Sequence, residues 1–89
     1  EMISQLPGWS LRWESPPRIM RDVELGSFQE ALDLVNRVGE IAEAEGHHPN
    51  ILMYSWNRVC FDVFTHAIGG LHENDFILAA KLNELIPAG

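Results

Sequence analysis

The chain has 89 residues, 46% of them hydrophobic, which suits one folded domain with a modest core and no low-complexity tract. Six Lys and Arg against 13 Asp and Glu give a formal net charge of -7, which argues against binding to nucleic acid or to an anionic membrane. The single cysteine excludes an internal disulfide, and no apolar run has the length of a membrane span. We therefore expect one domain over residues 1–89, in the cytoplasm unless a targeting segment has been removed.

Two alternating segments near the N-terminus predict a β-hairpin. Residues 9–13 and 18–25 alternate apolar and polar side chains, which is the period of a half-buried strand. The dipeptide Pro16-Pro17 separates them and favours a short turn. Trp9 and Trp13 fit core positions better than a platform for a ligand.

The main helix is expected to follow Ser27 and to end near Gly46. Ser27 and Glu30 have the spacing of a capping box, and glycine ends helices because it adopts the left-handed conformation at low cost. Apolar side chains recur through this segment at helical spacing and predict a face packed on a sheet: Phe28, Ala31, Leu32, Val35, Val38 and Ala42.

The C-terminal half predicts a second pair of strands and a last helix. Residues 51–54 and 58–66 form the strands, and Phe64 falls on the face turned away from the helices, which indicates contact with a partner. Residues 73–86 form the helix, with a buried stripe of Leu78, Ala79, Leu82, Leu85 and Ile86. The order strand-strand-helix-strand-strand-helix, after a remnant of an N-terminal helix, predicts an α+β fold. Its four-stranded, mainly antiparallel sheet carries the helices on one face.

Three histidines in the middle of the chain are the candidates for chemistry near neutral pH. Pro49 favours an extended conformation at His48, so His47 and His48 are expected in a connection between a helix and a strand. His66 ends the predicted fourth strand. Because imidazole changes charge near neutral pH, these side chains could supply both a proton donor and a proton acceptor.

Spacing alone leaves other interpretations of these residues open. The histidines could be polar residues of a turn and a strand end, or zinc ligands, although no His-x-x-x-His pair supports a metal site. Asp75 either caps the last helix or orients a histidine. Glu43 lies in the last turn of the main helix, where the dipole does not favour a carboxylate, and this is compatible with a functional role. His72 is assigned to the start of the last helix and not to the pocket.

One constellation resembles a known family. The pattern Glu43-x-x-x-His47-His48-Pro49, followed by Trp56, His66 and Asp75, is similar to the signature of the pterin-4a-carbinolamine dehydratases. The resemblance extends over about residues 6–86. Short motifs that match the family include Gly8-Trp9, Trp56-Asn57-Arg58-Val59 and Asn74-Asp75-Phe76.

The chain also departs from the vertebrate-type members of that family. The segment from Pro49 to Trp56 is one residue longer, and Gly46 and Ile51 stand where those members often carry aspartate and tryptophan. These differences concern the rim of the expected pocket and not the histidines.

The resemblance implies a lyase that removes water from 4a-hydroxytetrahydropterin, the carbinolamine left when an aromatic amino acid hydroxylase uses tetrahydropterin. It implies His47, His48 and His66 as the acid–base set, with His48 and His66 foremost, and no metal or organic cofactor. Further residues are implied as supporting groups (Glu43, Trp56 and Asp75) and as contacts of the substrate (Trp9, Pro49, Thr65 and Ala67).

The resemblance also implies homodimers joined through sheet edges, often paired into tetramers. Two alternatives remain beside catalysis. One is a dimerisation or interaction module, because vertebrate relatives also partner a homeodomain transcription factor. The other is pterin handling in another pathway, such as maintenance of the molybdenum cofactor. The presence of all three histidines favours catalysis, because an interaction module would not need them.

Overall fold

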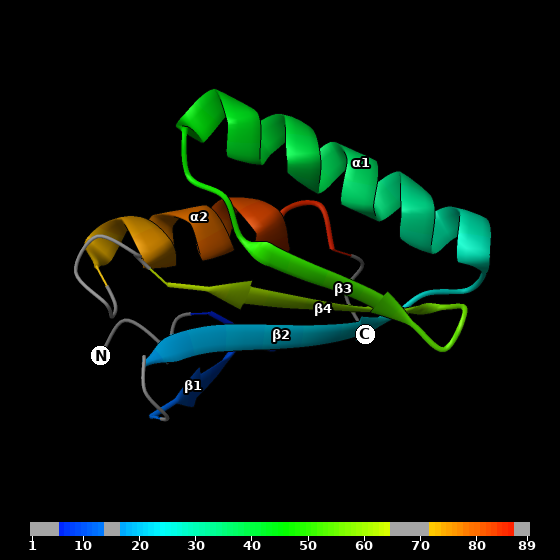
Figure 1. The fold of residues 1–89 in the computed structure, drawn as a ribbon, viewed down its shortest axis with the longest axis horizontal. Coiled ribbons are helices and arrows are strands. Elements are labelled where there is room, and N and C mark those ends of the chain that lie inside the picture. The colour runs from blue at the N-terminus through cyan, green and yellow to red at the C-terminus, as the bar shows by residue number, and fades with distance from the viewer. Residues whose placement is uncertain (1–5, 14–16, 65–71, 87–89) are drawn as a thin grey trace.

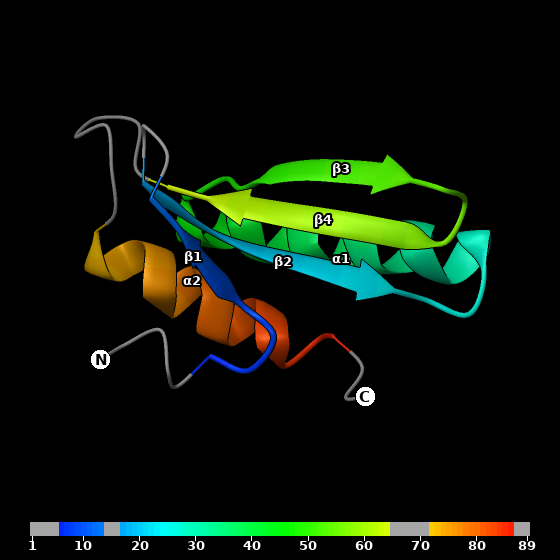
Figure 2. The ribbon, with the colours of Figure 1, turned by 90° about the horizontal axis from the view of Figure 1, so that it is seen from below.

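The computed structural model of the chain describes residues 6–13, 17–64 and 72–86. In chain order its elements are β1 (Ser10–Arg12), β2 (Arg18–Glu24), α1 (Phe28–Glu45), β3 (Asn50–Tyr54), β4 (Arg58–Val63) and α2 (Glu73–Asn83). The strands form one sheet in the order β1-β2-β4-β3, and every neighbouring pair is antiparallel. Both helices cover the same face of this sheet (Figures 1 and 2). The predicted α+β fold is confirmed.

The core lies between the sheet and the two helices. In β4 the side chains of Val59, Phe61 and Val63 face the helices and are fully buried, and those of Cys60 and Asp62 between them lie on the open face, as predicted from the alternation. The other elements add buried apolar side chains, among them Ile19 and Val23 of β2, Ala31, Leu34, Val38 and Ala42 of α1, and Leu78, Ala79 and Leu82 of α2.

The buried stripe of α1 differs from the prediction. Leu34, absent from the predicted face, is buried, whereas Leu32 and Val35 are half-buried and Phe28 is exposed. The helix is apolar on a broad sector, so two neighbouring stripes were compatible with the sequence. Contact with the sheet selects the stripe that contains Leu34.

Several other boundaries also differ. Strand β4 ends at Val63, so the predicted strand over 58–66 is too long within the described residues. Helix α2 ends at Asn83, not at residue 86, because the N–H groups of Leu85 and Ile86 both donate to the carbonyl of Leu82 in a tight final turn. Trp13 is 75% exposed, so its predicted core position is wrong.

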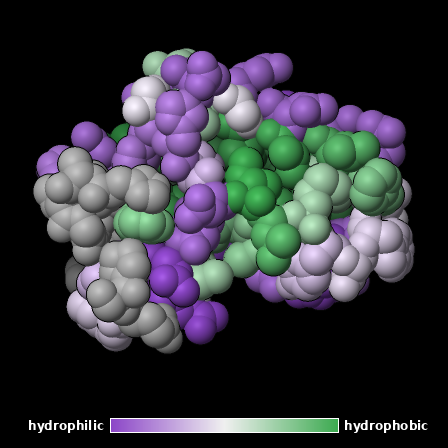
Figure 3. Space-filling view, in the orientation of Figure 1, coloured by the Kyte–Doolittle hydropathy of each residue, from purple (hydrophilic) through white to green (hydrophobic). Residues whose placement is uncertain are grey.

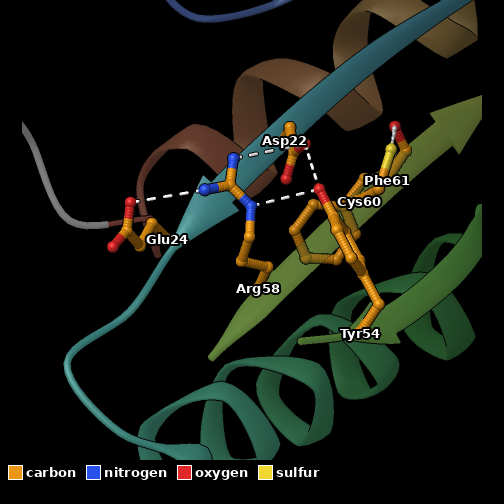
Figure 4. Close-up of polar contacts among 6 residues, drawn as sticks. All are labelled: Asp22, Glu24, Tyr54, Arg58, Cys60 and Phe61. Carbon is orange, nitrogen blue, oxygen red and sulfur yellow. Dashed lines mark hydrogen bonds and ion pairs between the residues drawn. The ribbon is translucent and has the colours of Figure 1, made fainter. Parts of the chain in front are cut away.

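The open face of the sheet is held by polar contacts across three strands. Figure 4 shows the Tyr54 hydroxyl of β3 donating to Asp22 of β2, while Arg58 Nε of β4 donates to the same hydroxyl at 3.1 Å. Arg58 also lies 3.3 Å from Glu24. The hydrogen bond to Asp22 raises the pKa of Tyr54, and burial raises the pKa of the Cys60 thiol beside this cluster. The contacts connect β2, β4 and β3 in the register of the backbone pairing.

Strand β3 is an edge of the sheet, because it pairs only with β4. Its Leu52 is exposed and Ile51 lies at the border of exposure. Figure 3 shows hydrophobic side chains gathered over β3 and below α1, bordered by the hydrophilic outer side of α1. Neither helix is long and apolar enough to cross a membrane, as far as the described residues extend.

Candidate functional site

The C-terminal end of α1 fixes the position of the histidine pair. Gly46 adopts the left-handed conformation (φ 64°, ψ 29°) and ends the helix, as predicted. The N–H of His47 then turns back and donates to the carbonyl of Ala42 at 3.1 Å. Residues 47–49 lead without regular structure into β3, so the histidines lie in the expected connection between a helix and a strand.

His47 is paired with a buried carboxylate. Its Nε2 lies 2.5 Å from Asp75 Oδ1, the His47 side chain is 20% exposed and the Asp75 side chain is 0% exposed. An ionised carboxylate only accepts hydrogen bonds, so with Asp75 ionised Nε2 carries the hydrogen. The Nδ1 of a neutral His47 then carries no hydrogen and can accept a proton.

Asp75 also caps α2. Its Oδ2 accepts the backbone N–H of His72 at 2.7 Å, and His72 Nδ1 accepts the N–H of Asn74 at 3.1 Å. The sequence left open whether Asp75 caps the helix or contacts a histidine. In the structure its side chain does both. His72 is the first residue of this cap, as predicted, but its link to His47 through Asp75 was missed. The spacing His72-x-x-Asp75 is that of a capping box and was the available signal.

His48 is in a different environment from His47. Its Nε2 lies 2.7 Å from Glu43 Oε2, and the two side chains are 61% and 80% exposed. Solvent screens such a pair, so it contributes little to stability. Pro49 is half-buried and directly precedes β3. The structure thus brings Glu43 to His48 and Asp75 to His47.

Two tryptophans named from the sequence do not join the histidines in this chain. Trp9 is buried, and its indole N–H donates to Asn83 Oδ1 at 2.7 Å, at the opposite end of α2 from Asp75. Eight residues of helix separate the two by about 12 Å along the axis. Trp56 is exposed in the turn after β3, whereas His48 precedes β3.

The remaining candidates, Thr65, His66 and Ala67, lie outside the described residues. Within the part of the chain that is described, no group of three or more His, Cys, Asp or Glu side chains is arranged to hold a metal ion.

Comparison with known proteins shows the family of this chain. The family profile described as "Pterin 4 alpha carbinolamine dehydratase" matches residues 1–85. The chain belongs to this family of hydro-lyases. A mitochondrial pterin-4-alpha-carbinolamine dehydratase 2 of Arabidopsis thaliana is 46% identical over 86 residues, which cover 96% of this chain and 46% of that protein. The chain thus spans about half the length of this relative.

Bacterial relatives are matched over more of their length. A protein of Chlorobaculum tepidum that bears the family name is 47% identical over 85 residues, which are 94% of this chain and 76% of that protein. The crystal structure of a transcriptional coactivator/pterin dehydratase from Brucella melitensis superposes with a TM-score of 0.88 at 27% identity. It covers 97% of this chain and 89% of the Brucella chain. Both the sequence and the fold of the family are therefore present.

Proposed function

We propose that this protein dehydrates 4a-hydroxytetrahydropterin to quinonoid dihydropterin and water, as a step in the recycling of tetrahydropterin. Membership of the dehydratase family supports the proposal. The observation that carries it is the contact between His47 and the buried carboxylate of Asp75, because this pairing prepares an imidazole for proton transfer.

The reaction needs two proton transfers and no oxidant or reductant. The C4a–O bond breaks as a proton is delivered to the departing hydroxyl, and water leaves. The lone pair of a ring nitrogen forms the new C=N bond, and the proton on that nitrogen passes to a base. One imidazole in the acidic form and one in the basic form can serve both transfers, and the proton balance of the protein is then unchanged.

His47 is the favoured base in this proposal. Asp75 holds the hydrogen on Nε2, which leaves Nδ1 as the acceptor and stabilises the imidazolium that forms. His48 has the exposed Glu43 beside it and exchanges protons readily with solvent, which suits the group that has to be protonated again after each turnover. His66 belongs to the same proposed set, and either His48 or His66 acts as the acid.

The flat substrate would lie against Pro49 and the backbone about Thr65 and Ala67. Trp9 stays a proposed substrate contact and Trp56 a proposed supporting residue, with Trp9 buried at the far end of α2 and Trp56 exposed beyond β3. No metal or organic cofactor is required, so extensive chelation should leave the rate unchanged. Loss of activity on chelation, with recovery on addition of zinc, would instead support a metal site.

The decisive experiment is an assay of carbinolamine dehydration by the purified chain. The parent should accelerate the loss of the carbinolamine above its spontaneous rate, and His47→Ala should remove most of that acceleration, typically about 10²–10⁴-fold. A folded parent without acceleration would contradict the proposal. The interaction-module alternative, consistent with the coactivator named for the Brucella protein, would then be favoured.

We also propose that the chain forms homodimers through a sheet edge, with tetramers as a further step. The exposed apolar side chains of the edge strand β3 support this, because its outer edge is a template for pairing with another chain. Light scattering should give a mass of at least twice the 10.1 kDa chain mass at micromolar concentration. Leu52→Lys should lower that mass, whereas a parent that is monomeric would exclude the dimer.

A further inference from the structure

Helix α2 begins with an unusual capping side chain. Capping positions favour Ser, Thr, Asp and Asn, whose oxygens are all acceptors at neutral pH. Here the cap is His72 (φ -133°, ψ 159°), whose Nδ1 lies 3.1 Å from the N–H of Asn74. A backbone N–H only donates, so Nδ1 must be the acceptor and must carry no hydrogen. The cap therefore exists only while this imidazole is neutral.

The cap is connected to the candidate site by two further contacts. The backbone N–H of His72 donates to Asp75 Oδ2 at 2.7 Å, and Asp75 Oδ1 lies 2.5 Å from His47 Nε2. Asp75 is fully buried, so its carboxylate needs hydrogen-bond partners within the protein, and these two contacts are among them. If the first turn of α2 opens, the N–H that holds Oδ2 moves and the contact with His47 changes with it.

We propose that His72 is a positioning residue: its neutral imidazole caps α2, holds Asp75 in place and so orients His47, and its protonation at acidic pH weakens that orientation. The inference rests on the proposed role of His47. In the protonated form Nδ1 would face the Asn74 N–H with a hydrogen of its own, and a positive charge would lie at the positive end of the helix dipole.

The charges around the cap act in both directions. Glu73 and Asp75 of α2 are negative and favour a protonated His72, whereas His47, which reaches this region from the end of α1, disfavours it when it is itself protonated. The lost acceptor and the helix dipole oppose protonation. Stabilisation by the cap is therefore present while the His72 imidazole is neutral and is lost when the imidazole takes up a proton.

The test compares the parent with two variants of the full chain. His72→Ser keeps an acceptor at the cap that cannot be protonated, and His72→Ala removes the acceptor. A cap stabilises a helix start by an amount that corresponds to roughly a fivefold change in an equilibrium constant. At about pH 8 the parent and His72→Ser should match in kcat/KM and in amide protection at Asn74. His72→Ala should be roughly fivefold lower in both quantities.

At about pH 5.5 the parent should fall towards His72→Ala while His72→Ser holds. The Ser-to-parent ratio of kcat/KM and that of amide protection at Asn74 should then each rise roughly fivefold. Intrinsic pH effects on exchange cancel in this ratio. A ratio that stays constant with pH would overturn the inference.

Two mixed outcomes are also decisive. If amide protection at Asn74 follows pH as expected but the kcat/KM ratio stays constant, the cap titrates without positioning His47, and the proposal is wrong. If no variant dehydrates the carbinolamine, the proposed function fails. The tautomer of His47, read from its ring ¹⁵N shifts in the parent and in His72→Ser at both pH values, then decides whether the cap orients it.

Discussion

Replacement of Asp75 by asparagine isolates the effect of its charge from the effect of its shape. Among its contacts, the carboxylate lies 2.5 Å from His47 Nε2 through Oδ1 and accepts the His72 N–H at 2.7 Å through Oδ2. Because the His72 N–H is always a donor, the amide oxygen of Asp75→Asn must face it, and the amide NH₂ must face His47. A neutral His47 can then keep a hydrogen bond only in the other tautomer, with Nε2 as acceptor and the hydrogen on Nδ1.

The expected result is a large loss of turnover with a small loss of stability. The base would carry its hydrogen on the wrong nitrogen, so kcat should fall by about 10²–10⁴-fold, equivalent to about 3–6 kcal/mol at 1.4 kcal/mol per tenfold change. Both hydrogen bonds survive in altered form, so the free energy of unfolding should fall by only about 1–2 kcal/mol. Stopped-flow dehydration kinetics and urea denaturation measure the two quantities.

Asp33→Asn is a matched control, because Asp33 accepts a hydrogen bond from Gln29 at 2.9 Å on the exposed side of α1. Asp33→Asn should change neither kcat nor the free energy of unfolding measurably. Dehydration by Asp75→Asn at the parent rate would refute the role of this carboxylate. A loss of stability that accounts for the lost activity would also refute it.

Three further predictions concern other residues. His47→Ala and His48→Ala should each slow dehydration, and the double variant should lose less than the product of the single losses, because groups acting in one step are not additive; a strictly multiplicative loss would contradict a shared step. Asn57→Ala should lower the free energy of unfolding by about 1–3 kcal/mol, because its buried side chain donates to the carbonyl of Leu25 at 2.9 Å; a loss below about 0.5 kcal/mol in urea denaturation would contradict this. Burial raises the pKa of the Asp62 carboxyl, so folding favours its protonated form, although Arg18 Nε lies 3.3 Å from it. The stability of the parent relative to Asp62→Asn should therefore fall as the pH rises from about 3 to 6; the opposite slope would show that the ion pair with Arg18 dominates.

Local chemistry made part of the fold predictable. Ser27 and Gly46 mark the ends of α1 because capping depends on residues within one turn, and Ser27 Oγ accepts the N–H of Glu30 at 3.1 Å. The alternation in β4 was equally readable, because it reflects one buried and one open face. The sequence could not predict that Leu34 is buried more fully than Leu32, since both positions are apolar and only packing on the sheet distinguishes them.

The sequence predicted which residues belong to the candidate site, but not which carboxylate contacts which histidine. Among these residues are Glu43, His47, His48 and Asp75. Glu43 and His48 lie five residues apart at the end of one helix, whereas His47 and Asp75 are 28 residues apart and meet only because α2 starts beside the end of α1. The sequence favoured His48 over His47, and the burial that distinguishes them appears only in the folded chain.

The left-handed cap at Gly46 has a consequence for the length of α1. Each residue of an α-helix turns the chain by about 100° and advances it by about 1.5 Å. His47 is tied to the last turn through the carbonyl of Ala42, so its direction follows the rotational phase of the helix. Deletion of one residue within α1, with its buried stripe still packed on the sheet, would turn the imidazole by about 100° away from Asp75 while every residue of the site remained. A change of one full turn would restore the direction but displace the ring by about 5 Å. The number of residues in α1 therefore constrains the site as strictly as the identity of its side chains.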